Sequence, residues 1–262
     1  MAGLPTVAEA FLSAGITVLL YDPRNTGISD GEPRNDIDPY QQLQDYSDAL
    51  TFLKTLTTVD PGQIGFWGTS LSAGVALSAA AFDKRVKLVI AACPVSSYQY
   101  NERKMQRILS MCSRDRESQV KGNPPFYTPM IDDSGESPVG LDFGFDRERA
   151  AEWAKREVKL APNHVNRTTI QSYLKIALWS PSATWKRINP TPVLFLVPEK
   201  DNICSPEEQL RNFNNLEGPK KYHLQEGSGH MDLLAGEHIG ALMKLQVDFV
   251  HDVLEGKMLP GV

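Results

Sequence analysis

The strongest structural signal in this chain lies in Ile64-Gly65-Phe66-Trp67-Gly68-Thr69-Ser70-Leu71-Ser72-Ala73-Gly74. Residues 64–67 are typical of a short buried strand, and small residues dominate 71–82, which favours a closely packed helix. Ser70 stands between them, with small residues two positions before and two after it. A turn this tight brings backbone against backbone, so both positions have to be small. The pattern predicts a sharp strand–turn–helix junction that exposes the Ser70 hydroxyl.

Strands and helices alternate around this turn, which is the pattern of a mostly parallel sheet covered by helices on both faces. We expect further strands over 16–21, 86–92, 192–197 and 221–225, and helices over 5–14, 41–56, 207–214 and 240–254. No internal repeat is visible. The chain therefore reads as one doubly wound α/β domain over residues 1–262.

The alternation stops between about residues 96 and 186. A first amphipathic helix includes Met105, a second begins near Asp146, and a third ends before Pro181. No convincing strand occurs between them. We interpret 96–186 as a helical lid inserted into the domain.

The apolar faces of the lid helices need a surface to pack against, and in this architecture they lie over the opening of the pocket above Ser70. Trp153, Tyr173 and Trp179 are therefore candidate walls of a substrate-binding pocket. The alternative is that these aromatic side chains only hold the lid together.

Ser70 needs a base, because a serine hydroxyl is a poor nucleophile until its proton is taken. In the α/β-hydrolase fold, where such turns hold the nucleophile, an acid and then a histidine follow in chain order on loops after strands. Asp201 is the preferred acid, with Glu199 as a rival on the same loop. His230 follows the last strand, on a loop flanked by glycines. We expect neutral His230 to accept the Ser70 proton while Asp201 holds the other ring N–H.

Other residues of the same types are weaker candidates. Ser72 falls inside the helix, and Asp201 could also be a solvated turn carboxylate. The remaining histidines occupy the lid, a strand or the final helix: His164, His223, His238 and His251. Only His230 stands where it can reach Ser70.

Composition excludes several classes of protein. The net charge of −5 argues against binding to nucleic acid, which needs clustered Lys and Arg. No apolar run is long enough for a membrane span, and no secretory signal is visible. The three cysteines form no metal or disulfide pattern, which suits the reducing cytoplasm. We expect no metal and no cofactor. The sequence leaves open whether the chain forms a homodimer.

These residues resemble the α/β-hydrolases of fungal secondary metabolism known as polyketide transferases and thiohydrolases, and their bacterial dienelactone-hydrolase-like relatives. Besides the Ser70 turn, the resemblance rests on Leu19-Leu20-Tyr21-Asp22-Pro23-Arg24, Gly27-Ile28-Ser29-Asp30-Gly31, Ile37-Asp38-Pro39, Val59-Asp60-Pro61 and Thr191-Pro192-Val193. Asn25 stands where relatives usually have Gly, and the lid matches only in outline. The resemblance implies acyl chemistry on a polyketide: hydrolytic release from a carrier protein, or transfer onto an alcohol.

The resemblance also concerns the start of the chain. Relatives carry about three strands before the first helix, and a His-Gly loop after the last of them gives one donor of the oxyanion hole. Leu71, the residue after the nucleophile, gives the other donor. Met1 aligns just beyond that loop, so we expect the first strands to be lacking and a gap between strands 16–21 and 64–67. Losing one donor costs about 10²–10³ in rate, which predicts weak turnover unless Leu71 gains a second donor.

Three functions remain in competition. The leading one is a serine hydrolase or acyltransferase that acts on an ester or thioester, either a small molecule or a carrier-bound acyl group. The second is a catalytically impaired protein of the same fold. The third is a non-hydrolytic lyase or cyclase that works through His230.

Overall fold

The structure is a computed structural model that describes residues 4–132, 135–141, 148, 151, 155, 161 and 165–258. Contacts within the chain define two compact units. The first, here called the insertion unit, comprises Met1–Ala2, Tyr21–Pro39 and Ser97–Trp179. The second, the sheet unit, comprises Gly3–Leu20, Tyr40–Ser96 and Ser180–Val262.

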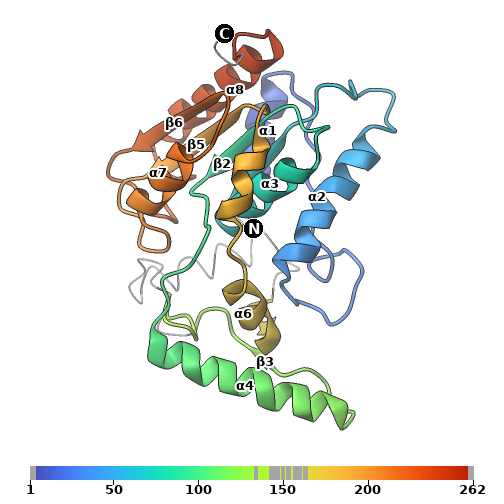
Figure 1. Cartoon of the computed structure of the whole chain (residues 1–262), viewed down its shortest axis with the longest axis vertical. Coiled ribbons are helices and arrows are strands. Elements are labelled where there is room, and N and C mark those ends of the chain that lie inside the picture. The colour runs from blue at the N-terminus through green and yellow to red at the C-terminus, as the bar shows by residue number, and fades with distance from the viewer. Residues whose placement is uncertain are drawn as a thin grey trace. The chain divides into compact units, whose positions relative to one another are not determined.

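The sheet unit is built on a four-stranded parallel sheet with the strand order β1-β2-β5-β6. The strands are β1 (Phe66–Thr69), β2 (Val89–Ala92), β5 (Val193–Pro198) and β6 (Lys220–Gln225). The helices of the unit are α1 (Leu4–Ser13), α2 (Pro39–Leu53), α3 (Leu71–Phe82), α7 (Pro206–Asn214), α8 (Ile239–Leu254) and the 3₁₀ helix η1 (Ser182–Ile188). Figure 1 shows the strands side by side with helices around them.

Alternation of side chains along the strands gives the sheet two apolar faces. On one face Val89 and Ala91 of β2 join a core with α2, α3, η1 and α7. On the other face Ile90 and Ala92 join a core with α1 and α8. The expected doubly wound arrangement, a parallel sheet covered on both faces, is confirmed.

The prediction of a strand over residues 16–21 is wrong. The segment has no strand structure, and Val18 and Leu20 are 39% and 51% exposed. Its β-branched and apolar composition satisfies the local preference for a strand, but a strand also needs a neighbour to pair with. Among the described residues, β1 pairs with β2 and with no other strand.

The insertion unit contains α4 (Glu102–Val120) and α6 (Ile170–Ala177), which pack on one another through Met105, Ile108, Ile170 and Tyr173. Two short strands, β3 (Tyr127–Thr128) and β4 (Thr168–Thr169), pair antiparallel. No strand was expected here, because two-residue strands leave no periodic pattern. The helix expected from Asp146 lies almost entirely outside the described residues.

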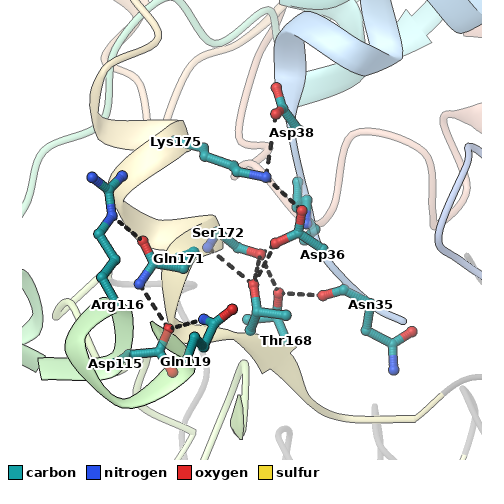
Figure 2. A network of polar contacts seen from close by, with 12 residues as sticks. Asn35, Asp36, Asp38, Asp115, Arg116, Gln119, Thr168, Gln171, Ser172 and Lys175 are labelled. Atoms are coloured by element: carbon teal, nitrogen blue, oxygen red, sulfur yellow. Dashed lines mark hydrogen bonds and ion pairs between the residues drawn. The ribbon is translucent and has the colours of Figure 1, made fainter. Parts of the chain in front are cut away.

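A polar network ties the loop before α2 to α6 within this unit (Figure 2). The buried Asp36 carboxylate accepts hydrogen bonds from Thr169 Oγ1 at 2.6 Å and from Lys175 Nζ at 2.5 Å. Lys175 Nζ also lies 3.3 Å from the Asp38 carboxylate. Buried charges are stable only when they are paired and hydrogen-bonded in this way. The loop over 21–39 is therefore part of the insertion unit, although it lies far from 97–179 in sequence.

Candidate active site

The turn at Ser70 has the geometry that the sequence predicts. Ser70 caps the N-terminus of α3 with φ 57° and ψ −125°, a backbone conformation that is strained for a residue with a side chain. Its N–H donates to the Ala92 carbonyl at 2.9 Å, and its own carbonyl accepts from the Val95 N–H at 3.3 Å. A Cβ atom at Gly68 would lie 2.4 Å from the Ser72 carbonyl oxygen, so only glycine fits there.

Ser72 contributes to the turn through its side chain. Its Oγ donates to the Thr69 carbonyl at 2.8 Å and accepts from the Thr69 N–H at 3.1 Å. Both bonds fasten the first turn of α3 to the end of β1. Ser72 therefore has a structural explanation, and Ser70 stays the preferred nucleophile.

Ser70, His230 and Asp201 come together in one hydrogen-bonded chain. Ser70 Oγ lies 2.7 Å from His230 Nε2, and His230 Nδ1 lies 2.8 Å from Asp201 Oδ2. The side chains of His230 and Asp201 are 5% and 0% exposed. This geometry matches a serine whose proton a histidine can take while a carboxylate orients the ring. That the three residues catalyse a reaction stays a prediction.

The Asp201 carboxylate is held by further donors. Its Oδ1 accepts from the Ile203 and Cys204 N–H groups at 2.8 and 3.0 Å. Its Oδ2 also accepts from Gln209 Nε2 of α7 at 2.9 Å. Gln209, which sequence reasoning missed, is fully buried and fixes the carboxylate that faces His230.

Glu199 lies in a different position from Asp201. Its Oε2 accepts from the Gly227 N–H at 2.8 Å, and the residue is exposed. Glu199 thus links the loop after β5 to the loop that carries His230. Of the two rival carboxylates, the one that faces the imidazole is Asp201.

Cys93 is a neighbour of His230 that sequence reasoning also missed. It follows the last residue of β2, has a φ of 41° and is 1% exposed. Ala92 pairs with Thr69 across the two strands, so Cys93 stands beside Ser70 at the same end of the sheet. Its Sγ lies 3.5 Å from Thr69 Oγ1, and its side chain is one of the groups that raise the pKa of His230. The sequence signal was a cysteine directly after the strand next to β1.

The surroundings of His230 favour its charged form. Burial opposes protonation, but Cys93 and Asp201 favour it, and together these effects raise the pKa of His230 from 6.5 to about 10. A general base works only in its neutral form. We therefore expect a rate that rises with pH on the acid side, with a midpoint above the ordinary histidine pKa.

Replacing Cys93 with alanine should shift that pH dependence. The substitution removes a group that stabilises the charged imidazole, so the pKa of His230 should fall and the acid limb of kcat/KM should move to lower pH. The measurement is a pH–rate profile with a chromogenic ester. Cys112→Ala, at a buried cysteine of the insertion unit, is the matched control and should leave the limb in place. An unchanged limb in Cys93→Ala would contradict the assigned role.

Leu71 is the first residue of α3, and its N–H therefore has no acceptor within the helix. Next to Ser70, such a group is suited to bind a negatively charged oxygen at the reacting carbonyl. Its part in an oxyanion hole, and the expectation of weak turnover, stay predictions.

A model described as the alpha/beta hydrolase family matches residues 3–238. The chain belongs to the alpha/beta hydrolase family. This alpha/beta hydrolase is similar to a thiohydrolase of Eupenicillium brefeldianum, 44% identical over 244 residues that cover 93% of this chain and 79% of that protein. It is also similar to the polyketide transferase claH of Penicillium crustosum, 41% identical over 256 residues that cover 95% of this chain and 82% of that protein.

The fold of this alpha/beta hydrolase is shared by a solved relative. The crystal structure of the alpha/beta hydrolase GrgF from Penicillium sp. sh18 superposes with a TM-score of 0.84 at 38% identity, covering 96% of this chain and 85% of that one. The resemblance drawn from the sequence is confirmed. The names of the relatives support an enzyme of the hydrolase or acyltransferase type.

The three aromatic residues predicted to form pocket walls in this alpha/beta hydrolase all fall within the sequence range of the insertion unit. Tyr173 is 7% exposed, packs between α4 and α6, and donates from its hydroxyl to the Pro129 carbonyl at 3.4 Å. Trp179 is 4% exposed, and Trp153 lies outside the described residues. The contacts of Tyr173 are those of a residue that holds the unit together, and the pocket-wall role stays a prediction.

Within the described part of this alpha/beta hydrolase, no group of three His, Cys, Asp or Glu side chains could hold a metal ion. In the same residues, no helix has the length and apolar character needed to cross a membrane.

Proposed function

We propose that this alpha/beta hydrolase cleaves or transfers an acyl group from an ester or thioester through an acyl-enzyme at Ser70. The observation that carries the proposal is the hydrogen-bonded chain from Ser70 Oγ through His230 to Asp201, at a strained turn between strand and helix. The names of the relatives support the same chemistry.

The reaction follows from this geometry in two halves. His230 Nε2 takes the Ser70 proton as Oγ attacks the carbonyl carbon, and Asp201 stabilises the imidazolium. The tetrahedral oxyanion receives a hydrogen bond from the Leu71 N–H. When the carbonyl re-forms, the alkoxide or thiolate leaves with the proton held by His230. Water or an alcohol then gives a proton to His230 and attacks the acyl-Ser70 ester. As the acyl–oxygen bond breaks, His230 returns that proton to Ser70 Oγ, and the acid or the new ester leaves.

The substrate class that we propose is a polyketide-type acyl thioester on a carrier protein, or a small-molecule ester of the same acyl group. A thiohydrolase and a polyketide transferase among the relatives favour this class. The proposed chemistry needs no cofactor, because Ser70, His230 and Asp201 supply nucleophile, base and orienting charge. We propose that the protein acts in the cytoplasm, where a carrier-bound thioester is available.

The test uses acyl thioesters of N-acetylcysteamine, which mimic the end of the carrier's arm. Wild-type protein is expected to release the thiol and to give the free acid in water, or the ester when an alcohol acceptor is present. Mass spectrometry of the products separates hydrolysis from transfer. Thiol release no faster than in buffer would favour the catalytically impaired alternative, and a product formed without acyl-oxygen or acyl-sulfur cleavage would favour the lyase or cyclase.

A further inference from the structure

Helix α7 packs against the sheet through an apolar stripe and also turns a polar stripe inward. On the apolar stripe, the Phe213 ring lies 5.5 Å from the Phe195 ring of β5 (Figure 1). The polar stripe consists of the N-cap and of side chains three, four and seven residues after it, which share one side of a helix: Ser205, Glu208, Gln209 and Asn212. Gln209 is completely buried, and the other three are half-buried. Polar groups are costly to bury unless they are hydrogen-bonded, so this stripe needs partners.

Gln209 binds the loop after β5, which carries the candidate acid. Its Nε2 donates to Asp201 Oδ2 at 2.9 Å and to the Cys204 carbonyl at 2.7 Å. Both amide hydrogens are used on acceptors, and the opposite amide orientation would place Oε1 against a carboxylate and a carbonyl. Among the described residues, the buried Oε1 itself receives no hydrogen bond. The loop alone therefore orients the amide, and Asp201 Oδ2, which binds it, is also the oxygen that faces His230.

Glu208 and Asn212 bind a second loop, which follows β2. Ser96 is 2% exposed, and its Oγ donates to Glu208 Oε1 at 2.6 Å and accepts from Asn212 Nδ2 at 2.8 Å. One residue earlier, the Val95 N–H donates to the Ser70 carbonyl at 3.3 Å. α7 thus holds the loop that contacts the backbone of the candidate nucleophile as well as the loop that carries the candidate acid.

We propose that the polar stripe of α7 is a positioning element for the acyl chemistry proposed above. Gln209 fixes the Asp201 carboxylate against His230, and Glu208 with Asn212 fixes the loop behind the Ser70 turn. A displacement of about 1 Å in such a constellation can cost about 10² in rate, even when the altered residue lies outside it. The inference rests on the proposed function, because positioning changes the rate only if Ser70 is the nucleophile.

Gln209→Met is the first test. Methionine has a similar length and volume but donates no hydrogen bond, so the packing of α7 is kept while Asp201 loses a donor. We expect kcat for thioester cleavage to fall by as much as about 10², with KM little changed. The control is Arg211→Gln, at an exposed position of the same helix, which should leave kcat unchanged. Thermal unfolding checks that both variants are folded.

Gln209→Glu separates positioning from packing. The introduced carboxyl can donate to Asp201 only while it is protonated, and the Asp201 charge beside it raises its pKa. The ratio of its kcat to that of wild type should therefore fall as the pH rises and the proton is lost. The titratable neighbours Glu208, Cys204 and His230 are present in both proteins. A defect of packing alone would lower this ratio equally at every pH.

The contact with Ser96 is tested at Glu208. Glu208→Gln keeps an oxygen that can accept from Ser96 Oγ, so most of the activity should remain. Glu208→Leu removes the acceptor and should lower kcat rather than raise KM. Equal activity of the two variants would show that this bond does not position the Ser70 turn.

Proton NMR reads the positioning of Asp201 without turnover. The proton between His230 Nδ1 and Asp201 should give a low-field resonance in wild type and in Arg211→Gln, and a shifted or broadened one in Gln209→Met. A wild-type protein without thioesterase activity would contradict the proposed function but would leave this comparison intact. An unchanged resonance in Gln209→Met, an unchanged kcat of that variant beside an active wild type, or a ratio for Gln209→Glu that does not vary with pH would each overturn the inference.

Discussion

Ser70→Ala is expected to lower kcat for ester or thioester cleavage by about 10⁶, the loss seen when the nucleophile of a Ser-His-Asp triad is removed. The variant keeps the turn, because the Ser70 backbone makes the contacts to Ala92 and Val95. Only the Oγ that lies 2.7 Å from His230 is lost. Steady-state kinetics with a chromogenic ester measure the effect, and circular dichroism checks the fold.

Ser72→Ala is the comparison for this result, because it removes the other hydroxyl of the turn. It loses two hydrogen bonds to Thr69 but keeps the proposed nucleophile. Its activity should therefore fall far less than that of Ser70→Ala. If Ser70→Ala retained activity within tenfold of wild type, or if Ser72→Ala were the inactive variant, the assignment of the nucleophile would be wrong.

Asp201→Asn is expected to lower kcat by about 10⁴, with the fold intact. Asparagine has the same shape but carries no charge, so it no longer stabilises the imidazolium or holds the tautomer that presents Nε2 to Ser70. The pKa of His230 should fall as well, because the Asp201 charge is one of the groups that raise it. A pH–rate profile of the residual activity measures this shift.

Glu199→Gln is the matched control on the same loop. Its side chain can still contact the Gly227 N–H through the amide oxygen, so less than a tenfold loss is expected. A loss as large as that of Asp201→Asn would identify Glu199 as the acid and would contradict the assignment to Asp201.

The turn and the candidate acid and base could be predicted from sequence because their signals are local or follow from chain order. The small residues Gly68 and Ser72 indicate directly that the backbone before Ser70 lies close to the backbone after it, since a larger side chain at either position would not fit. Asp201 and His230 can be predicted because they follow the strands expected at β5 and β6. The carboxyl ends of parallel strands meet at one edge of the sheet, so residues on those loops come together.

The features that could not be predicted from sequence depend on contacts between residues far apart in the chain. The segment 16–21 has the composition of a strand, but a strand depends on a neighbour that local sequence does not reveal. The places of Cys93 and Gln209 beside the candidate acid and base depend on the strand register and on the packing of α7, which the local sequence does not give. The attachment of Asp36 to Thr169 likewise depends on folding, since no pattern in either segment points to the other.

The most direct test of the proposed chemistry is to locate the residue that a fluorophosphonate modifies. These reagents phosphonylate a serine whose proton a neighbouring base can take, so the label reports an activated nucleophile even where turnover is slow. Intact-mass spectrometry should show one adduct per chain, and peptide mapping should assign it to Ser70, with no adduct in Ser70→Ala. A wild-type protein that stays unlabelled, or an adduct on any residue other than Ser70, would contradict an acyl-enzyme at this serine.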